Sequence, residues 1–140
     1  MSAEPQGPPL VREWLETHGL GGCARGRAAG TRTRRYHGLL SVAMQPPGDR
    51  WLLVNGFDAR VTTTTGEWAI SSQAYEGGEV RPDARALLES FAHEPWPTWV
   101  FALPDGTRIE QQVLRREGVP LAALSWKLLT KRKSVTLRVK

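Results

Sequence analysis

"TWVFALPDGTRIEQQVLRRE", residues 98–117, is the stretch of sequence that decides the fold. It contains a β-branched and aromatic run, then Pro104-Asp105-Gly106, then a second run in which polar and apolar residues alternate. Proline, aspartate and glycine are the residues that tight turns favour. The stretch therefore predicts two strands joined by a tight turn.

Most of the chain after Tyr36 has the same strand-like character. Further strands are predicted in HGLLSVAM (37–44), RWLLVNGF (50–57), DARVTTTTGEWAISS (58–72, a hairpin around Thr65-Gly66), ALLESFAHE (86–94), VPLAALSWKLLT (119–130) and KSVTLRVK (133–140). Short turns and the lack of helical crossover segments predict an all-β, antiparallel β-sandwich.

The last predicted strand, residues 133–140, alternates Val135, Leu137 and Val139 with polar residues. This alternation predicts one buried face and one solvated face. The strand runs to Lys140 without a closing turn, so we expect a sandwich that is incomplete at its C-terminus, with an unpaired edge.

The N-terminal part of the chain, unlike the rest, is predicted to contain a short helix and a loop. LVREWLETHG, residues 10–19, has four-residue spacings that favour a short helix capped by Gly19, although an extended segment remains open. Glycines between residues 19 and 30 predict a loop of about fifteen residues. Residues 1–9 are expected to be a flexible lead, and residues 10–140 one domain.

Composition excludes several classes of function. The net charge of +5 comes from two separate cationic groups with no nucleic-acid-binding signature, so no nucleic-acid partner is expected. No apolar run reaches the length of a membrane span, and no membrane partner is expected. A single cysteine, Cys23, rules out an internal disulfide and favours a cytoplasmic location.

The reactive side chains do not form a recognisable catalytic or metal pattern. His18, Cys23, His37 and His93 lack ligand spacing, and no catalytic residue, metal or cofactor is expected. A nucleophilic Cys23–His37 couple remains open, but a lone cysteine is more often a small core residue. The carboxylates lack an obvious acid/base pair and are interpreted as surface charges.

Two further motifs have plain structural readings. GLGGCA, residues 19–24, matches the dinucleotide pattern G-x-G-x-x-A, but the following RGRAAG is poor helix material, so no nucleotide site is predicted. Trp96 and Trp99 could stack on one sugar only if the chain bends at Pro97. Core packing is the preferred interpretation for Trp99 and Trp126.

The densest group of polar side chains is Arg34, Arg35, Tyr36 and His37. Arginine forks bind carboxylates or sugar hydroxyls, and tyrosine and histidine add directional donors and acceptors. One alternative is an ordinary strand in which the two arginines alternate and one is solvated. Gly38 directly afterwards indicates close backbone approach at the start of a strand, which favours a domain contact or the wall of a site.

EWLETHGLGGCARG (13–26) and GTRTRRYHGLL (30–40) together resemble the N-terminal domain of the bacterial and archaeal type of glycogen debranching enzyme. That family typically has E-W-L-x-T-N-G-L-G-G-Y-A-S-G-T followed by T-R-R-Y-H-G-L-L. The chain departs from this pattern at His18, Cys23 and Arg25, where asparagine, tyrosine and a small residue are usual.

The resemblance implies a mutarotase-like supersandwich that precedes an (α/α)6 domain, which hydrolyses α-1,6-glucosidic branch stubs. The catalytic acids would belong to that domain, which this chain is expected to lack. The implied partners are the catalytic domain and α-glucan (glycogen or limit dextrin). The implied substrate-binding or domain-docking residues are Arg34, Arg35, Tyr36, His37, Gly19, Gly21 and Gly22. The alternative function is a stand-alone carbohydrate-binding or scaffold module without catalysis.

Overall fold

The computed structural model describes residues 10–45 and 48–140, and within them the chain forms eleven β-strands and one short 3-10 helix. The elements are β1 (Glu13–Thr17), β2 (Cys23–Arg27), β3 (Gly38–Gln45), β4 (Gly48–Val54), β5 (Ala59–Thr62), β6 (Glu67–Ala69), η1 (Arg85–Leu87), β7 (Leu88–Ala92), β8 (Thr98–Ala102), β9 (Arg108–Arg116), β10 (Val119–Leu128) and β11 (Thr136–Val139). None of the described helices is long and apolar enough to cross a bilayer. The expected lead, residues 1–9, lies outside the described residues.

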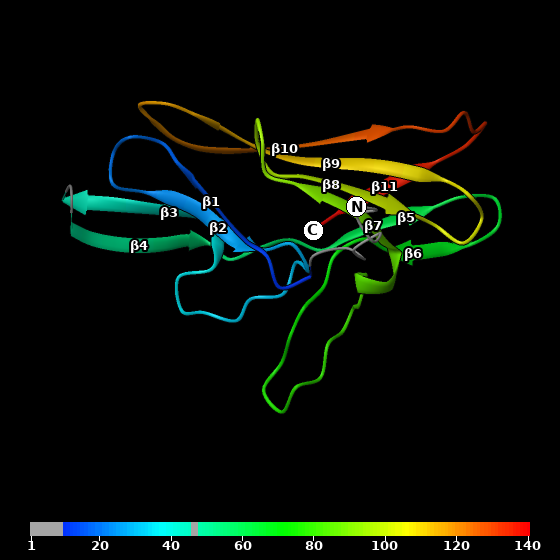
Figure 1. Cartoon of the computed structure of the whole chain (residues 1–140), viewed down its shortest axis with the longest axis horizontal. Helices are drawn as coiled ribbons and strands as arrows, with labels where there is room; N and C mark the ends of the chain where they lie inside the picture. Colours follow the sequence, from blue (N-terminus) through cyan, green and yellow to red (C-terminus); the bar gives the residue numbers. More distant parts are fainter. Residues whose placement is uncertain (1–9, 46–47) are drawn as a thin grey trace, which may run out of the picture.

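The strands form three antiparallel sheets, which confirms the predicted all-β architecture. The first sheet has the order β1-β2-β3-β4, the second β10-β9-β8-β7, and the third β11-β5-β6. Figure 1 shows the first sheet on the left and the third on the right. The predicted turn at residues 104–106 joins β8 to β9, and Gly106 has a φ of +83°, a backbone conformation that glycine adopts readily.

The core is a cluster of aromatic and aliphatic side chains from all three sheets. Trp99 is 4% exposed, packs edge-on against Trp14 with ring centroids 5.5 Å apart, and lies 5.0 Å from the Phe91 ring. Its indole N–H donates to the Ala28 carbonyl at 2.8 Å. These contacts confirm the core interpretation of Trp99, because its ring is packed among aromatic side chains and its N–H has a buried acceptor.

Trp126 packs at the margin of this core. It lies edge-on to Phe57 with centroids 5.6 Å apart, and its Nε1 donates to Gln111 Oε1 at 2.9 Å. The side chain is partly buried and contacts the core cluster, as its core interpretation predicts.

The helix favoured for residues 10–19 is wrong, because Glu13–Thr17 form strand β1. Trp14 is 6% exposed and its neighbour Leu15 is 47% exposed, so burial alternates with a period of two. Trp14 lies opposite Gly26 of β2. The four-residue spacings are compatible with a helix in isolation, but in the folded chain this segment pairs with β2 and places the Trp14 indole in the core cluster.

The predicted fifteen-residue loop is also wrong, because it contains strand β2. A side chain at Gly22 would overlap His18 and the Ser41 carbonyl, and a Cβ at Gly26 would lie 3.3 Å from the Trp14 indole. Glycine within a strand often marks a place where another group approaches the backbone closely. These glycines therefore permit the hairpin that they were expected to prevent.

The face predicted to be buried in the last strand is only partly buried: Val135 packs against the core cluster, whereas Leu137 and Val139 are more exposed. Leu137 and Val139 lie opposite Val61 and Ala59 of β5, which are fully buried, yet they are 37% and 41% exposed. The alternation correctly predicts that Leu137 and Val139 lie on the same face of the sheet as the buried residues of β5. It overestimates burial because β11 is an outer strand with no further strand beside it among the described residues.

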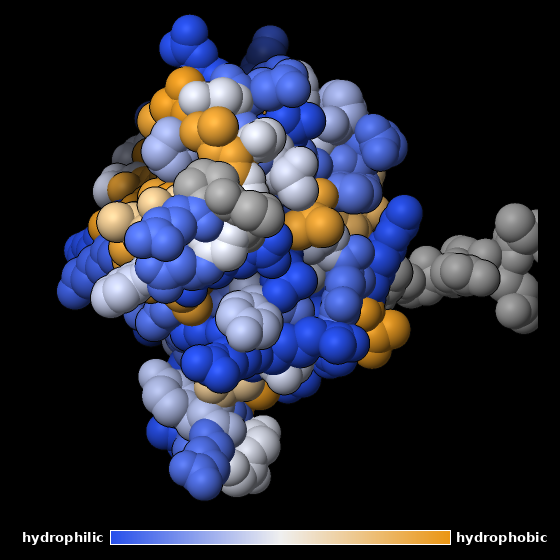
Figure 2. Space-filling view, turned by 90° about the vertical axis from the view of Figure 1, so that its left-hand side faces the viewer, coloured by the Kyte–Doolittle hydropathy of each residue, from blue (hydrophilic) through white to orange (hydrophobic). Residues whose placement is uncertain are grey.

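The first sheet also has an outer strand, β4, with large hydrophobic side chains that are exposed. β10 contacts β3, and Val42 of β3 is 8% exposed. Trp51 lies opposite Val42 on β4, one strand further out, and is 58% exposed. Met44 and Leu53 are also exposed, and Figure 2 shows hydrophobic residues at the surface of this end of the molecule among hydrophilic ones.

Candidate functional site: the arginine and tyrosine groove

Residues 34–37 form a turn between β2 and β3. The His37 N–H donates to the Arg34 carbonyl at 3.1 Å, and β3 begins immediately afterwards at Gly38. The alternative of an ordinary strand with alternating arginines is therefore excluded. The predicted loop-to-strand junction is present, and it sits beside β1 because Arg34 reaches Glu13.

His37 anchors this turn from inside the protein. Its side chain is 2% exposed, Nδ1 accepts a hydrogen bond from the Thr33 N–H at 3.2 Å, and Nε2 lies 3.8 Å from Glu13 Oε1. Burial lowers the pKa of His37; the Glu13 carboxylate opposes this shift, whereas nearby arginines add to it. The neutral imidazole is therefore favoured, with its proton on Nε2.

Glu13 is the carboxylate that faces this group of cations. Its Oε1 lies 2.7 Å from Arg34 Nε and 3.9 Å from Arg27 Nε. The hydrogen bond from Arg34 is the main reason why the pKa of Glu13 is below its usual value. Glu13 is thus held as an anion at the start of β1.

Tyr36 carries the exposed aromatic surface of the turn. It is 48% exposed, and the guanidinium carbons of Arg25 and Arg35 lie 5.3 Å and 5.6 Å from its ring centroid. Arg25 Nε also donates to the Tyr36 carbonyl at 3.2 Å. The two distances from the guanidinium carbons to the ring centroid are within the range of cation–π attraction, which holds these groups near the ring.

These side chains border an open groove of about 530 Å³. The lining residues are Glu13, Trp14, Leu15, Arg25, Arg34, Tyr36, His37 and His93. The groove combines planar cationic forks, one carboxylate and an aromatic ring. Such groups recognise carboxylates and other polar, planar ligands through directional hydrogen bonds.

The predicted glycines lie elsewhere. Gly19 and Gly21, with φ of +82° and +77°, form the turn that connects β1 to β2, and Gly22 follows them. This turn packs against the β9–β10 turn, where the Gly118 N–H donates to the His18 carbonyl at 2.7 Å. The strand β1 separates it from the Glu13 end by about 13 Å at ~3.3 Å per residue.

The structure thus brings together Arg34, Arg35, Tyr36 and His37, and places the three glycines at the opposite end of the β1–β2 hairpin.

Sequence reasoning missed five of the groove residues, of which Glu13 and Arg25 carry a charge. Glu13 was interpreted as a surface charge, and Arg25 was noted only as a departure from the family pattern. Both become neighbours of the turn because β1 and β2 pair in the register Glu13↔Arg27 and Leu15↔Arg25. Opposite charges on two candidate strands were the available signal, but the signal could be used only once the hairpin was recognised.

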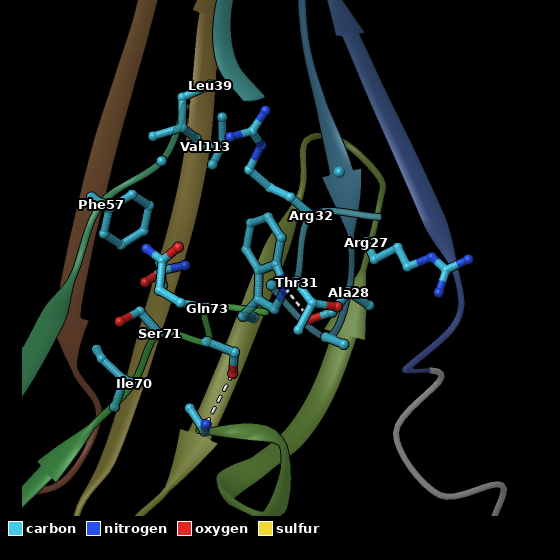
Figure 3. Close-up of a pocket in the computed structure, with 18 of the residues that line it drawn as sticks. Arg27, Ala28, Thr31, Arg32, Leu39, Phe57, Ile70, Ser71, Gln73 and Val113 are labelled. Atoms are coloured by element: carbon cyan, nitrogen blue, oxygen red, sulfur yellow. Dashed lines mark hydrogen bonds between the residues drawn. The ribbon is translucent and has the colours of Figure 1, made fainter. Parts of the chain in front are cut away.

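A second, smaller cavity of about 80 Å³ lies where the three sheets meet (Figure 3). Labelled residues around it include Phe57, Ile70, Gln73 and Val113, whereas Arg27 is directed away from them. An apolar cavity of about 150 Å³ accommodates benzene, and a glucosyl residue has almost twice as many non-hydrogen atoms. This cavity is therefore too small to enclose a glucosyl residue.

The remaining reactive residues do not assemble a centre in the described structure. The ring nitrogens of His37 face Thr33 and Glu13, so the Cys23–His37 couple is not formed. Cys23 is a buried residue of β2, and residues 10–45 and 48–140 contain no group of three potential metal ligands. GLGGCA joins two antiparallel strands, which is the wrong context for a dinucleotide fingerprint.

The fold and the groove define an antiparallel β-sandwich domain with a cationic and aromatic groove at one end of its first sheet. No curated protein and no solved structure gives a significant match to the chain. Residues 12–140 match the family described as "Glycogen debranching enzyme N terminal". The chain belongs to this family.

Proposed function

We propose that the chain is a noncatalytic N-terminal domain of a glycogen debranching enzyme, and that it supports hydrolysis of α-1,6-glucosidic branch stubs by an (α/α)6 catalytic domain. The observation that carries this proposal is the family match over residues 12–140. The proposed partners are that catalytic domain and α-glucan, and the proposed location is the cytoplasm.

The state of the carboxylates supports a noncatalytic role. A glycosidase needs a general acid whose pKa is raised by its surroundings. Instead, the pKa values of Glu13, Asp83 and Asp105 are all shifted downwards. Hydrogen bonds from Arg34 and Arg85 are the main causes at Glu13 and Asp83. These three carboxylates are therefore poor proton donors, and the proposal assigns the general acid to the catalytic domain.

Docking is proposed to use Arg34, Arg35 and Tyr36 of the turn at residues 34–37, with the buried His37 holding the turn in place. The turn containing Gly19, Gly21 and Gly22 would form a second contact at the other end of the β1–β2 hairpin. Two contacts about 13 Å apart along one strand would fix the orientation of the partner better than a single contact does. Glucan binding would then occur at the border between the two domains.

The test uses the 140-residue chain and the (α/α)6 domain of a glycogen debranching enzyme from the same genome. We expect no glucose release from a branched limit dextrin by the chain alone, a stable complex on mixing, and faster release by the complex than by the catalytic domain alone. Glucose release by the purified chain would refute the noncatalytic assignment.

Calorimetric titration with maltooligosaccharide separates the proposal from a stand-alone carbohydrate-binding module. Saturable binding by the chain alone, together with no complex in the mixing experiment, would favour the module.

A further inference from the structure

We propose that a carboxylate-bearing segment of the catalytic domain binds at the groove through two guanidinium groups: that of Arg25, which lines the groove, and that of Arg35, which contacts the Tyr36 ring beside it. This inference rests on the proposed function for the identity of the partner. The recognition chemistry itself is argued from the charges and contacts around Tyr36.

The first argument is an excess of positive charge. Five arginines lie in or next to the groove, and Glu13 is the carboxylate within ion-pair distance of any of them in residues 10–45 and 48–140. Five positive charges and one negative charge leave a local net charge of +4. The five are Arg25, Arg27, Arg32, Arg34 and Arg35.

The second argument is how each arginine is used. Arg34 pairs with Glu13, and Arg32 donates from Nε to the His37 carbonyl at 2.7 Å. Arg25 uses Nε for the Tyr36 carbonyl, and Arg35 contacts the Tyr36 ring. Within the described part of the chain, neither Arg25 nor Arg35 has a carboxylate within 4.0 Å.

The third argument is preorganisation. Arg25 is held in place by the hydrogen bond from its Nε and by the Tyr36 ring. Its two terminal nitrogens donate to no acceptor among the described residues. A guanidinium fork with free terminal nitrogens matches a carboxylate through two parallel hydrogen bonds. Holding the fork in advance reduces the side-chain entropy that is lost on binding.

The fourth argument selects a carboxylate over the other ligands. A neutral glucan would leave the charge excess uncompensated, and the Tyr36 ring that a sugar would stack on already contacts two guanidinium groups. A nucleic acid would bring a continuous row of phosphates past Glu13, which lines the same groove and would repel them. Separate carboxylates on a folded partner avoid this repulsion.

The experiment compares two double variants of the 140-residue chain. Arg25→Ala with Arg35→Ala removes the proposed forks, and Lys131→Ala with Lys133→Ala removes the same charge from the exposed β10–β11 connection. We expect the first pair to weaken binding of the (α/α)6 domain at least about 30-fold, as loss of a desolvated charge contact does. The control pair should change binding less than about 3-fold.

A third variant tests the fork itself. Arg25→Lys with Arg35→Lys keeps the charge but loses the paired donors, so we expect it to recover only part of the affinity. Full recovery would overturn the fork geometry, and unchanged binding of the double alanine variant would overturn the inference while leaving the proposed function intact. Unfolding curves for every variant verify that the fold is retained.

Titration of the chain alone with tetraglutamate and tetraglutamine separates the two proposals. Preferential binding of tetraglutamate that depends on Arg25 and Arg35 supports carboxylate recognition, even if the catalytic domain fails to bind and the proposed function falls. Equal binding of both peptides overturns the inference. Tighter, steeply salt-dependent binding of duplex DNA at the same arginines also overturns it, in favour of a polyanion.

Discussion

Trp99 gives the sharpest test of the core, because the chain contains a matched control. Trp99 is 4% exposed and lies at the meeting point of Trp14, Phe91 and the Ala28 carbonyl. Trp51 is 58% exposed on the outer strand β4. Both positions carry the same side chain, so replacement by alanine removes the same atoms from two different environments.

The expected cost follows from burial. Truncation of a fully buried tryptophan costs about 3–5 kcal/mol through lost transfer free energy and the cavity that remains, and it also leaves the Ala28 carbonyl without its donor. Truncation of a largely exposed side chain usually changes stability by less than about 0.5 kcal/mol. The total stability of a domain of this size is about 5–15 kcal/mol, so Trp99→Ala should remove a large part of it.

Urea unfolding, followed by far-UV circular dichroism, measures the difference. With a slope of about 2 kcal/mol per molar urea, a loss of about 4 kcal/mol lowers the midpoint for Trp99→Ala by about 2 M. The midpoint for Trp51→Ala should move by about 0.25 M or less. If Trp99→Ala does not fold, Trp99→Phe should lose about 1–3 kcal/mol, because it leaves the Ala28 carbonyl unpaired. Equal shifts for positions 99 and 51 would refute the assignment of the core.

Two further predictions concern pH and backbone packing. Burial opposes ionisation of Asp105, but hydrogen bonds from Thr107, Thr63 and Thr65 outweigh it and hold the pKa of Asp105 well below its usual value. The ionised Asp105 therefore stabilises the folded state fully above about pH 4, and this stabilisation is lost as the pH falls further. Asp105→Asn should flatten the acid limb of stability against pH, and an unchanged limb would contradict this. Gly22→Ala should lower the melting temperature, because the new methyl overlaps His18 and a backbone carbonyl, whereas Gly56→Ala meets nothing within 4 Å and should leave it nearly unchanged. Equal melting temperatures for these two variants would contradict the close packing at Gly22.

The strands that could be predicted are those whose signals are local. The turn at residues 104–106 joins β8 to β9 as expected, since proline, aspartate and glycine specify the turn within three residues. The hairpin around Thr65-Gly66 also formed, with the Thr63 N–H donating to the Gly66 carbonyl at 2.9 Å. In both cases, the chain needs no distant segment to choose its conformation.

The N-terminal hairpin could not be predicted in this way. Residues 10–19 are compatible with a helix or a strand, and the choice is made by a partner strand that supplies Gly26 opposite Trp14. The glycines suggested a loop because their usual effect is to weaken strands. Here they are required by the close approach of neighbouring groups, which no local pattern reveals.

By itself, the sequence determined the strand-rich class, the turns at Thr65-Gly66 and residues 104–106, and the dense polar segment at Arg34–His37, because each depends on neighbouring residues. Only the tertiary structure decided that Glu13 and Arg25 complete a groove with that segment, and that the glycine turn lies at the other end of the hairpin. The physical reason is strand pairing. The register of β1 with β2 determines which charges meet, and that register depends on contacts between residues that are distant along the chain.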